Sequence, residues 1–229
     1  MRIEDDPDIV AAFLKDESGL YGSALGVARP TCAKEVADFV MESFALRRKL
    51  LPVGAQTAVT GAAVPQGDVV LSMRGMAGVL DIDTKHRWAD VLPGTLTFDM
   101  KQVIEAQELY YPPDPTSEHD CTIGGNVATN ASGARSFRFG MTARWIEEID
   151  VVTGTGDRMT FSRRHPDKDT AGYGPFLDPV SLFVGSEGTL GVITRIRLRL
   201  MTNPGPAAGF LVFFPSERDA LDVAVGYRL

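Results

Sequence analysis

The amino-acid sequence predicts a mixed α+β fold, because helical and strand-like patterns occur together in one chain. Apolar residues at helical spacing follow Thr31, whereas the stretch from Arg195 to Leu200 alternates strictly between arginine and aliphatic side chains. Three glycine-rich segments lie between elements of these two kinds. With 229 residues and 44% hydrophobic content, the chain can bury a sizeable core, as one large domain or two small ones.

Composition and charge exclude several classes of function. The 23 Lys and Arg residues against 30 Asp and Glu residues give a formal charge of −7, which argues against nucleic acid as a partner. The cysteines, Cys32 and Cys121, form no CxxC pattern, and His86, His119 and His165 lack metal-ligand spacing, so we expect no metal site. Because no run reaches 18 apolar residues, we expect no transmembrane segment and a cytoplasmic protein.

The first part of the chain predicts a strand, a helix and two further strands. A short strand ends near Val27 to Pro30, and Thr31 is placed to cap a helix that continues to about Lys49. Apolar residues on one face support this helix: Val36, Phe39, Val40 and Phe44. A buried strand at Leu50 to Val53 then leads through a small-residue loop to a strand at Val69 to Ser72.

The central part predicts short strands and a second helix. Strands are expected at Gly78 to Asp83 and Ala89 to Leu92, and a helix from Thr97 to about Leu109. Trp145 to Val152 and Arg158 to Phe161 flank the turn TGTGD and predict a β-hairpin. Neighbours on a strand point to opposite faces, so adjacent Glu147 and Glu148 are interpreted as edge charges rather than a catalytic pair.

The last part of the chain predicts a long strand and an incomplete β-α unit. Ser162 to Pro179 is polar and is expected to cross the surface. In the strand that ends at Leu200, Arg195, Arg197 and Arg199 are expected on a solvated face. The stretch FLVFFPS, which begins at Phe210, is expected to form a strand that leads into a helix.

Three glycine-rich segments carry the functional signal. Thr122 to Gly140 contains four glycines and two asparagines, which favours backbone pressed against a flat or charged ligand, with an ordinary surface loop as the alternative. Gly54 to Pro65 suits a nest of N–H groups around phosphate oxygens, or a plain tight connection, and has no Walker lysine. In the third segment, Glu187 is placed to orient a ligand or to brace the turn.

Together these segments resemble a known family. In order, PVGAQTAVTGAAVP, YPPDPTSEHDCTIGGNVATNASGARSFRFG and LFVGSEGTLGVITRIRLRL are similar to the vanillyl-alcohol-oxidase type flavoproteins with a PCMH-type FAD-binding domain. The branch they resemble contains the glycolate oxidase D subunit, D-lactate dehydrogenase and D-2-hydroxyglutarate dehydrogenase. The resemblance runs from about Gly26 to Leu200. It implies an FAD-binding domain over 1–203, with α/β subdomains of roughly 20–85 and 86–203, and the beginning of a truncated substrate (cap) domain over 204–229.

The resemblance also implies which residues hold FAD. The first segment would bind the pyrophosphate, the second the flavin and its ribityl-phosphate chain, and the third the adenosine end. The implied residues are Gly54, Ala55, Gln56, Thr57, Thr60, Gly61, Pro112, Pro113, Asp114, Thr122, Gly124, Gly125, Asn126, Thr129, Asn130, Ser132, Gly133, Glu187, Gly191, Val192 and Ile193.

Two departures from the family pattern accompany this assignment. Ala55 and Gln56 stand where glycines are common in the family, and Val53 stands where many relatives have arginine. No His or Cys occurs between Gly54 and Pro65, so we expect non-covalent FAD. His119 and Cys121 lie close enough to the second segment for covalent attachment to be tested.

By resemblance, the chain is the FAD-binding part of an oxidoreductase that acts on CH–OH donors. The resemblance implies oxidation of a 2-hydroxy acid of the glycolate, D-lactate or D-2-hydroxyglutarate type, by hydride transfer to flavin N5. The reduced flavin would then pass its electrons to an electron acceptor. Catalytic residues of relatives lie mainly beyond Leu229, so none is assigned, and we expect the chain to be a fragment or one half of a split enzyme. His119 has an acid-base or a plain surface role. The alternatives are a non-catalytic FAD-binding or assembly module with a partner subunit, and an oxidase of another alcohol-type substrate.

Overall fold

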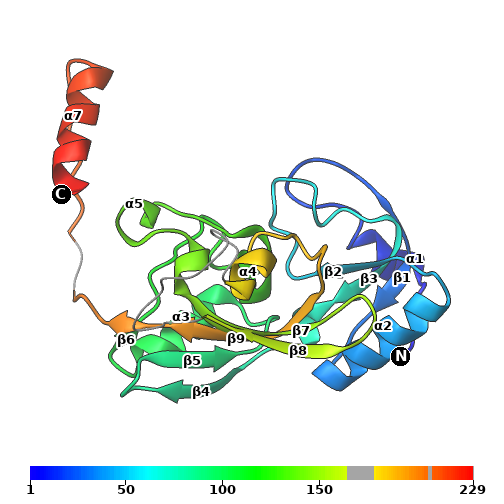
Figure 1. Ribbon diagram of the computed structural model, residues 1–229. Helices are drawn as coiled ribbons and strands as arrows, with labels where there is room; N and C mark the ends of the chain where they lie inside the picture. Colours follow the sequence, from blue (N-terminus) through cyan, green and yellow to red (C-terminus); the bar gives the residue numbers. More distant parts are fainter. Residues whose placement is uncertain (164–177, 206–207, 229) are drawn as a thin grey trace.

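The computed structural model describes residues 1–163, 178–205 and 208–228, and it confirms a mixed fold of helices and strands. The two larger of its three sheets lie beside each other, and most of the helices pack on them (Figure 1). The stretch predicted to cross the surface, Ser162 to Pro179, falls mainly on 164–177 and so lies outside the described residues.

The N-terminal sheet has three parallel strands in the order β1-β3-β2. The strands are β1 (Ser23–Ala28), β2 (Leu50–Val53) and β3 (Gln66–Ser72). Helix α2 (Ala33–Ala45) makes the crossover from β1 to β2. Its buried face contains Val36, Phe39 and Val40, as the helical spacing predicted, whereas Phe44 is 63% exposed. Helix α1 (Pro7–Ala11) precedes this unit and is capped by Asp6.

The larger sheet has five strands in the order β4-β5-β9-β7-β8, and all its neighbours are antiparallel. The strands are β4 (Val79–Asp83), β5 (Trp88–Val91), β7 (Ile146–Val152), β8 (Arg158–Ser162) and β9 (Val192–Arg199). Strand β9 is central, because Ile196 pairs with Val91 of β5 on one side and with Ile149 of β7 on the other. The predicted hairpin of β7 and β8 is confirmed.

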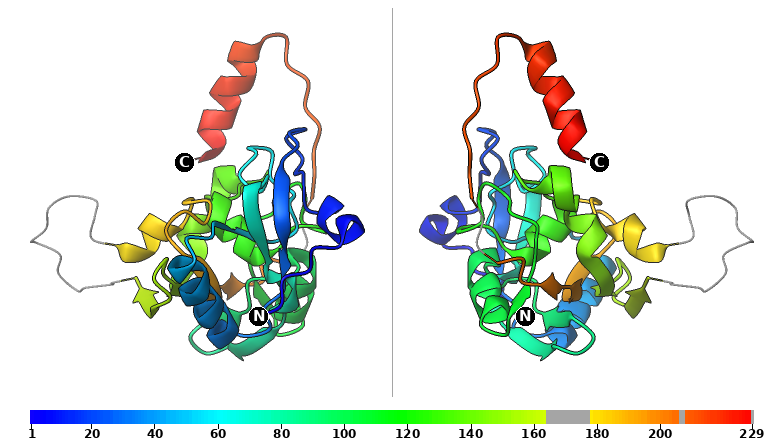
Figure 2. Two further views of the ribbon diagram at one scale, coloured as in Figure 1. Left: turned by 90° about the vertical axis from the view of Figure 1, so that its right-hand side faces the viewer. Right: turned by 90° about the vertical axis from the view of Figure 1, so that its left-hand side faces the viewer.

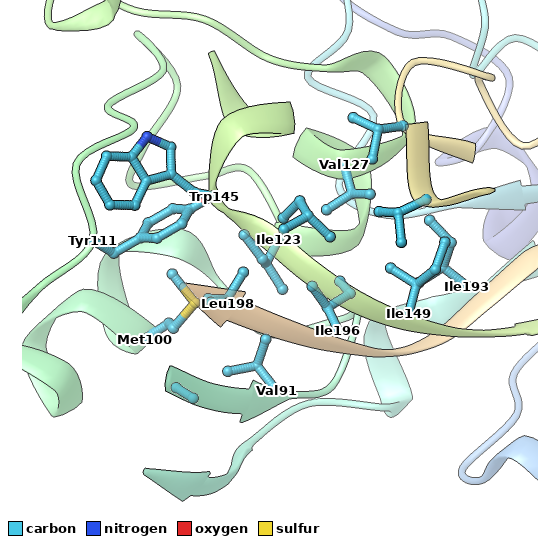
Figure 3. Packing of buried hydrophobic residues seen from close by; sticks show 14 of the residues in the cluster. Val91, Met100, Tyr111, Ile123, Val127, Trp145, Ile149, Ile193, Ile196 and Leu198 are labelled. Carbon is cyan, nitrogen blue, oxygen red and sulfur yellow. The ribbon is translucent and has the colours of Figure 1, made fainter. Parts of the chain in front are cut away.

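The main core lies on one face of this sheet. Helices α3 (Thr97–Glu105) and α4 (Ile123–Thr129) bring Met100, Ile123 and Val127 against the strands. Figure 3 shows these side chains directed toward Ile196 and Leu198 of β9. The apolar half of the alternation in β9 is therefore buried, as predicted.

The remaining elements are short. They are η1 (Met73–Gly75), β6 (Leu109–Tyr110), α5 (Ser136–Phe139), η2 (Thr142–Trp145), α6 (Pro179–Phe183), β10 (Met201–Thr202) and α7 (Glu217–Arg228). Strands β6 and β10 pair with each other, so the backbone after β9 returns to the end of α3.

The arginines of β9 were predicted to lie on a solvated face, but two of the three are held by partners on neighbouring strands. Arg195 is 19% exposed and forms ion pairs with Asp90, Glu148 and Asp150 on the neighbouring strands. Arg197 is bound to Asp90 and lies over the Trp88 ring, so of the three arginines Arg199 fits a solvated position best. The interpretation of Glu147 and Glu148 as edge charges is wrong, because β7, which contains both, has partner strands on both sides.

Two further expectations are corrected. The cap of α2 is Cys32, while the N–H and hydroxyl of Thr31 both donate to the Glu35 carboxylate, at 2.7 and 2.9 Å. The stretch from Phe210 forms no strand within the described residues, where it finds no pairing partner and Phe210 stays 90% exposed. The helix predicted after it is confirmed as α7, which stands away from the rest of the chain (Figure 2). Among the described residues, no helix combines the length and apolar character that a membrane span requires.

Candidate functional site

A large cavity of about 1070 Å³ lies where the three glycine-rich segments meet. Residues 52–63 approach from the end of β2, residues 115–132 surround α4, and residues 187–193 lead into β9. Pockets that hold cofactors commonly have volumes of roughly 300–1,000 Å³, so this cavity is large enough for an elongated ligand. Segments that are far apart in sequence thus enclose one space.

Most of the residues predicted for the site line this cavity. They are Gly54, Ala55, Gln56, Thr57, Thr60, Thr122, Gly124, Gly125, Asn126, Thr129, Asn130, Ser132, Glu187, Gly191, Val192 and Ile193. Five predicted residues lie outside the lining among the described residues: Gly61, Pro112, Pro113, Asp114 and Gly133.

The residues outside the lining have structural neighbours that explain their position. Pro112 and Pro113 are buried, and the Asp114 carboxylate accepts a hydrogen bond of 3.0 Å from the Arg135 N–H. A Cβ atom on Gly133 would lie 1.8 Å from the Asp114 carbonyl oxygen, so glycine is required for the backbones to meet there. These residues hold the second segment together behind the surface that faces the cavity.

The first segment presents backbone N–H groups that the described part of the protein does not use. From Ala55 to Thr60, no N–H group has an acceptor among the described residues. Gln56 has a φ of 58°, a left-handed conformation typical of glycine, and its side-chain amide donates to the carbonyl oxygens of Phe13 (3.0 Å) and Lys15 (2.8 Å). These hydrogen bonds fix a loop in which glutamine stands where the family that the sequence resembles commonly has glycine.

The second segment is not an ordinary surface loop, the alternative that the sequence left open, because its centre forms helix α4. Thr122 caps this helix and accepts a hydrogen bond of 3.3 Å from the Gly125 N–H. The Ile123 and Gly124 N–H groups donate to the carbonyl oxygens of Thr95 and Pro93, at 2.9 and 2.8 Å. The first amides of α4 are therefore used inside the protein, which corrects the expectation that they orient a ligand.

The glycines of α4 serve close packing. A Cβ atom on Gly124 would lie 2.7 Å from the Pro93 side chain, and one on Gly54 would lie 2.1 Å from the Thr122 hydroxyl oxygen. The Asn126 side chain donates to the Thr97 hydroxyl at 2.7 Å and points into the core. The first and second segments can thus touch because position 54 has no side chain.

The third segment is attached to both of the others. The Gly185 and Glu187 N–H groups donate to the Val127 and Ala128 carbonyl oxygens of α4, at 2.9 and 2.8 Å. The Glu187 carboxylate accepts a hydrogen bond of 3.1 Å from the Thr60 hydroxyl. Glu187 has a φ of 52°, so its conformation is also left-handed. These contacts show the bracing role that the sequence left open.

Charged side chains in the lining are mainly acidic. Glu17, Asp120 and Glu187 contribute carboxylates, whereas Arg74 contributes the one guanidinium in this lining. His119 also lines the cavity, and its ring contacts the Phe98 ring in a tilted arrangement, with centroids 4.2 Å apart.

Sequence reasoning missed Arg74, which follows the end of β3 and belongs to no recognisable motif. Cys121 is 2% exposed, donates to the Thr97 hydroxyl and does not contribute to the cavity lining. Within the described part of the chain, no three His, Cys, Asp or Glu side chains are grouped as metal ligands would be.

Comparisons with known proteins agree with this geometry. A family model described as "FAD binding domain" matches residues 24–162. Glycolate oxidase subunit GlcD of Bacillus subtilis is 36% identical over 179 residues, which are 78% of this chain and 37% of that protein. A D-2-hydroxyglutarate dehydrogenase of Xanthomonas citri pv. viticola is 34% identical over 230 residues, which cover 100% of this chain and 48% of that protein.

A solved structure of alkyldihydroxyacetonephosphate synthase is similar to this chain. Its TM-score is 0.66 at 26% identity, and the match covers 77% of this chain and 31% of that one. The chain therefore spans less than half the length of each of these relatives.

Proposed function

Because the chain belongs to the FAD-binding domain family, we propose that it is the FAD-binding part of an oxidoreductase that oxidises the CH–OH group of a 2-hydroxy acid. The relatives named glycolate oxidase, D-2-hydroxyglutarate dehydrogenase and D-lactate dehydrogenase support this substrate class. A substrate of the glycolate, D-lactate or D-2-hydroxyglutarate type, an electron acceptor and a possible partner subunit all belong to the proposal.

One observation carries the cofactor assignment. Six consecutive N–H groups, from Ala55 to Thr60, border a cavity of about 1070 Å³ and have no acceptor among the described residues. Backbone N–H groups are strong donors that seek acceptors, and an array of them suits the oxygens of a diphosphate. The donor set of the first segment therefore fits the central part of FAD.

The other segments fit the two ends of the same ligand. We assign the flavin and ribityl side to the surface around Gly125, Thr129 and Ser132, and the adenosine side to Glu187 and Gly191 to Ile193. Bound flavin supplies a hydride acceptor, while the chain binds and orients it. Pro112, Pro113, Asp114 and Gly133 act behind this surface, by holding its backbone in place, whereas Gly61 has a φ of 81° at a turn of the first segment.

We further propose that the FAD-binding unit extends over 1–203, with subdomains of roughly 20–85 and 86–203, and that 204–229 begins the next domain. The separation of the chain into a three-stranded and a five-stranded sheet supports the internal boundary. A cytoplasmic location is also part of the proposal and is supported by the two free cysteines, Cys32 and Cys121.

The test is to purify the chain and to measure its bound flavin. We expect a yellow protein whose flavin spectrum persists after gel filtration and whose FAD is released by acid, as non-covalent binding requires. A colourless protein that does not bind added FAD would contradict the proposal. Flavin that stays in the acid pellet would contradict non-covalent binding alone.

The substrate class is tested separately under anaerobic conditions. Glycolate, D-lactate and D-2-hydroxyglutarate are added to the FAD-loaded protein, with L-lactate as the stereochemical control, and bleaching of the flavin absorbance is followed. Bleaching by one of the first three acids supports oxidation of a 2-hydroxy acid. Bound FAD that none of them bleaches would favour a non-catalytic module that needs a partner chain.

A further inference from the structure

The proposed FAD cavity has a lining that is poorly matched in charge to a diphosphate. Glu17, Asp120 and Glu187 add three carboxylates, and Arg74 is the one Lys or Arg among the residues that line it. With His119 neutral, the lining has a formal charge of −2. The two negative charges of a diphosphate would be repelled by this lining, and backbone N–H groups carry only partial positive charges to offset the repulsion.

The register of the N-terminal sheet places Arg74 beside the loop with the unused N–H groups. Ser72, the last residue of β3, pairs with Val53, the last residue of β2, and the two strands are parallel. The backbone therefore leaves both strands at the same edge of the sheet, where η1 contacts β2. Ala55 and Arg74 each lie two residues beyond this pair, and both line the cavity.

The backbone of Arg74 is held firmly at this edge. The Met76 N–H donates to the Met73 carbonyl oxygen at 2.9 Å, and the Gly94 N–H donates to the Met76 carbonyl oxygen at 2.8 Å. A Cβ atom on Gly94 would lie 2.9 Å from the Cα atom of Arg74. Pro93, which precedes Gly94, packs against Gly124, so the same turn contacts both the backbone of Arg74 and the beginning of α4.

The guanidinium group of Arg74 has no partner within the described residues. No ion pair, hydrogen bond or aromatic ring engages it there, and the side chain is exposed to the cavity. Arg135 and Arg195, in contrast, are paired with carboxylates. Arg74 is therefore free to bind an anion that enters the cavity.

We propose that Arg74 forms an ion pair with the diphosphate of FAD and supplies a positive charge that offsets the three carboxylates of the lining. This inference rests on the proposed function. A guanidinium group presents paired N–H donors that match two phosphate oxygens, and it stays charged at any physiological pH. Arg74 also borders a smaller cavity of about 580 Å³ beside Thr95 and Asp99. An anion bound in that cavity would compete with the FAD diphosphate for the guanidinium group.

The experiment compares FAD with a flavin that has no phosphate. Flavin-free protein is titrated with FAD, riboflavin and ADP, by flavin fluorescence or calorimetry, at about 0.05 M and about 0.5 M salt. The variants are Arg74→Met, which removes the charge, and Arg74→Lys, which retains it. Lys85→Met is the matched control, because Lys85 is an exposed cation in the turn after β4, outside both cavities. Circular dichroism checks that each variant is folded.

We expect Arg74→Met to weaken FAD and ADP binding about 10-fold to 100-fold, as loss of a charge-assisted contact does. It should leave riboflavin binding within about twofold and reduce the effect of salt on FAD affinity. Arg74→Lys should recover part of the affinity, and Lys85→Met should behave as the wild type.

Three results would overturn the inference while leaving the proposed function intact. They are unchanged FAD binding by Arg74→Met, an equal loss for FAD and riboflavin, and a defect confined to bleaching by a 2-hydroxy acid. The last of these would assign the guanidinium to a substrate carboxylate. Failure of the wild-type chain to bind FAD would instead contradict the proposed function itself.

Discussion

The hydroxyl group of Thr60 donates a hydrogen bond of 3.1 Å to the carboxylate of Glu187, and this bond joins cavity segments that are 127 residues apart. The Glu187 N–H is in turn bonded to the Ala128 carbonyl oxygen at the end of α4. Glu187 thus ties all three segments together. Both residues line the cavity, so the contact joins the first and third segments at its rim.

Thr60→Val removes this donor and retains the shape of the side chain. We expect FAD to bind about threefold to tenfold more weakly, because one hydrogen bond that orders the rim is lost. Thr60→Ser retains the hydroxyl and is the matched control. Fluorescence titration measures both variants. Equal FAD affinities for the valine and serine variants would show that the Thr60 hydroxyl does not shape the site.

Gly54→Ala should force apart the first segment and α4. The new Cβ atom would lie 2.1 Å from the hydroxyl oxygen of Thr122, which is 1% exposed and cannot move aside freely. We expect the free energy of unfolding to fall by about 1–3 kcal/mol, measured by urea denaturation. Gly154→Ala is the control, because a Cβ atom there meets nothing within 4 Å.

A double variant tests the cause of that loss. Thr122→Ala alone should cost about 1 kcal/mol, because it removes the cap of α4. In combination with Gly54→Ala, however, it removes the clashing oxygen. The double variant should therefore be more stable than the sum of the single effects predicts, by about 1 kcal/mol. Strict additivity would argue against steric contact as the origin.

Gln56 offers a test of backbone strain in the first segment. Gln56→Ala retains the left-handed conformation but loses the hydrogen bonds to the Phe13 and Lys15 carbonyl oxygens. Gln56→Gly loses the same bonds but tolerates the φ of 58° without strain. We expect the alanine variant to be less stable than the glycine variant by about 1 kcal/mol in urea denaturation. The reverse order would show that the conformation is not retained.

The ion-pair network around Arg195 should make stability depend on acid pH. Burial raises the pKa of Glu148 and of Asp150, but hydrogen bonds from Ser162, Thr160 and Arg195 outweigh it, so both pKa values lie below their ordinary range. A lowered folded-state pKa stabilises the fold above the unfolded pKa, which is about 4 for these groups, and this stabilisation is lost as pH falls through the folded-state values.

Arg195→Met should abolish much of that dependence. The variant leaves Asp90, Glu148 and Asp150 without their shared cation, so we expect a loss of about 2–4 kcal/mol at neutral pH and a smaller further loss toward acid. Arg199→Met on the same strand, where the side chain is 59% exposed, should change stability by less than about 0.5 kcal/mol. Urea denaturation from pH 7 down to about pH 3 measures both variants. Parallel pH profiles for wild type and Arg195→Met would contradict this account.

Periodic patterns predicted most of the regular elements, because periodicity is local. Helix α2 and strands β2, β7 and β9 lie where their spacing placed them. Helix α4 escaped prediction, since Gly124 and Gly125 have low helix propensity and the helix depends on the Thr122 cap and on carbonyl groups from a distant turn. The apolar stretch after Phe210 has strand propensity, but a strand also needs a neighbour to bond.

The sequence predicted which segments form the candidate site, but not the position of every residue in it. Composition located all three glycine-rich segments, because small residues mark close approach of the backbone wherever they occur. It did not show that the Asp114 region lies behind the cavity, nor that Arg74 borders it. Arg74 reaches the site through the parallel register of β2 and β3, which is a relation between distant residues.

The contact between Gly54 and Thr122 has a thermodynamic consequence. The cavity exists only when segments from the first loop to Ile193 are assembled. Its formation therefore requires the same loss of chain entropy as closing the long loops of the whole fold. A ligand that binds such a site binds the native state and has little affinity for partly folded chains. Saturation with FAD should therefore raise the melting temperature of both sheets together, by linkage, rather than protect the loops alone.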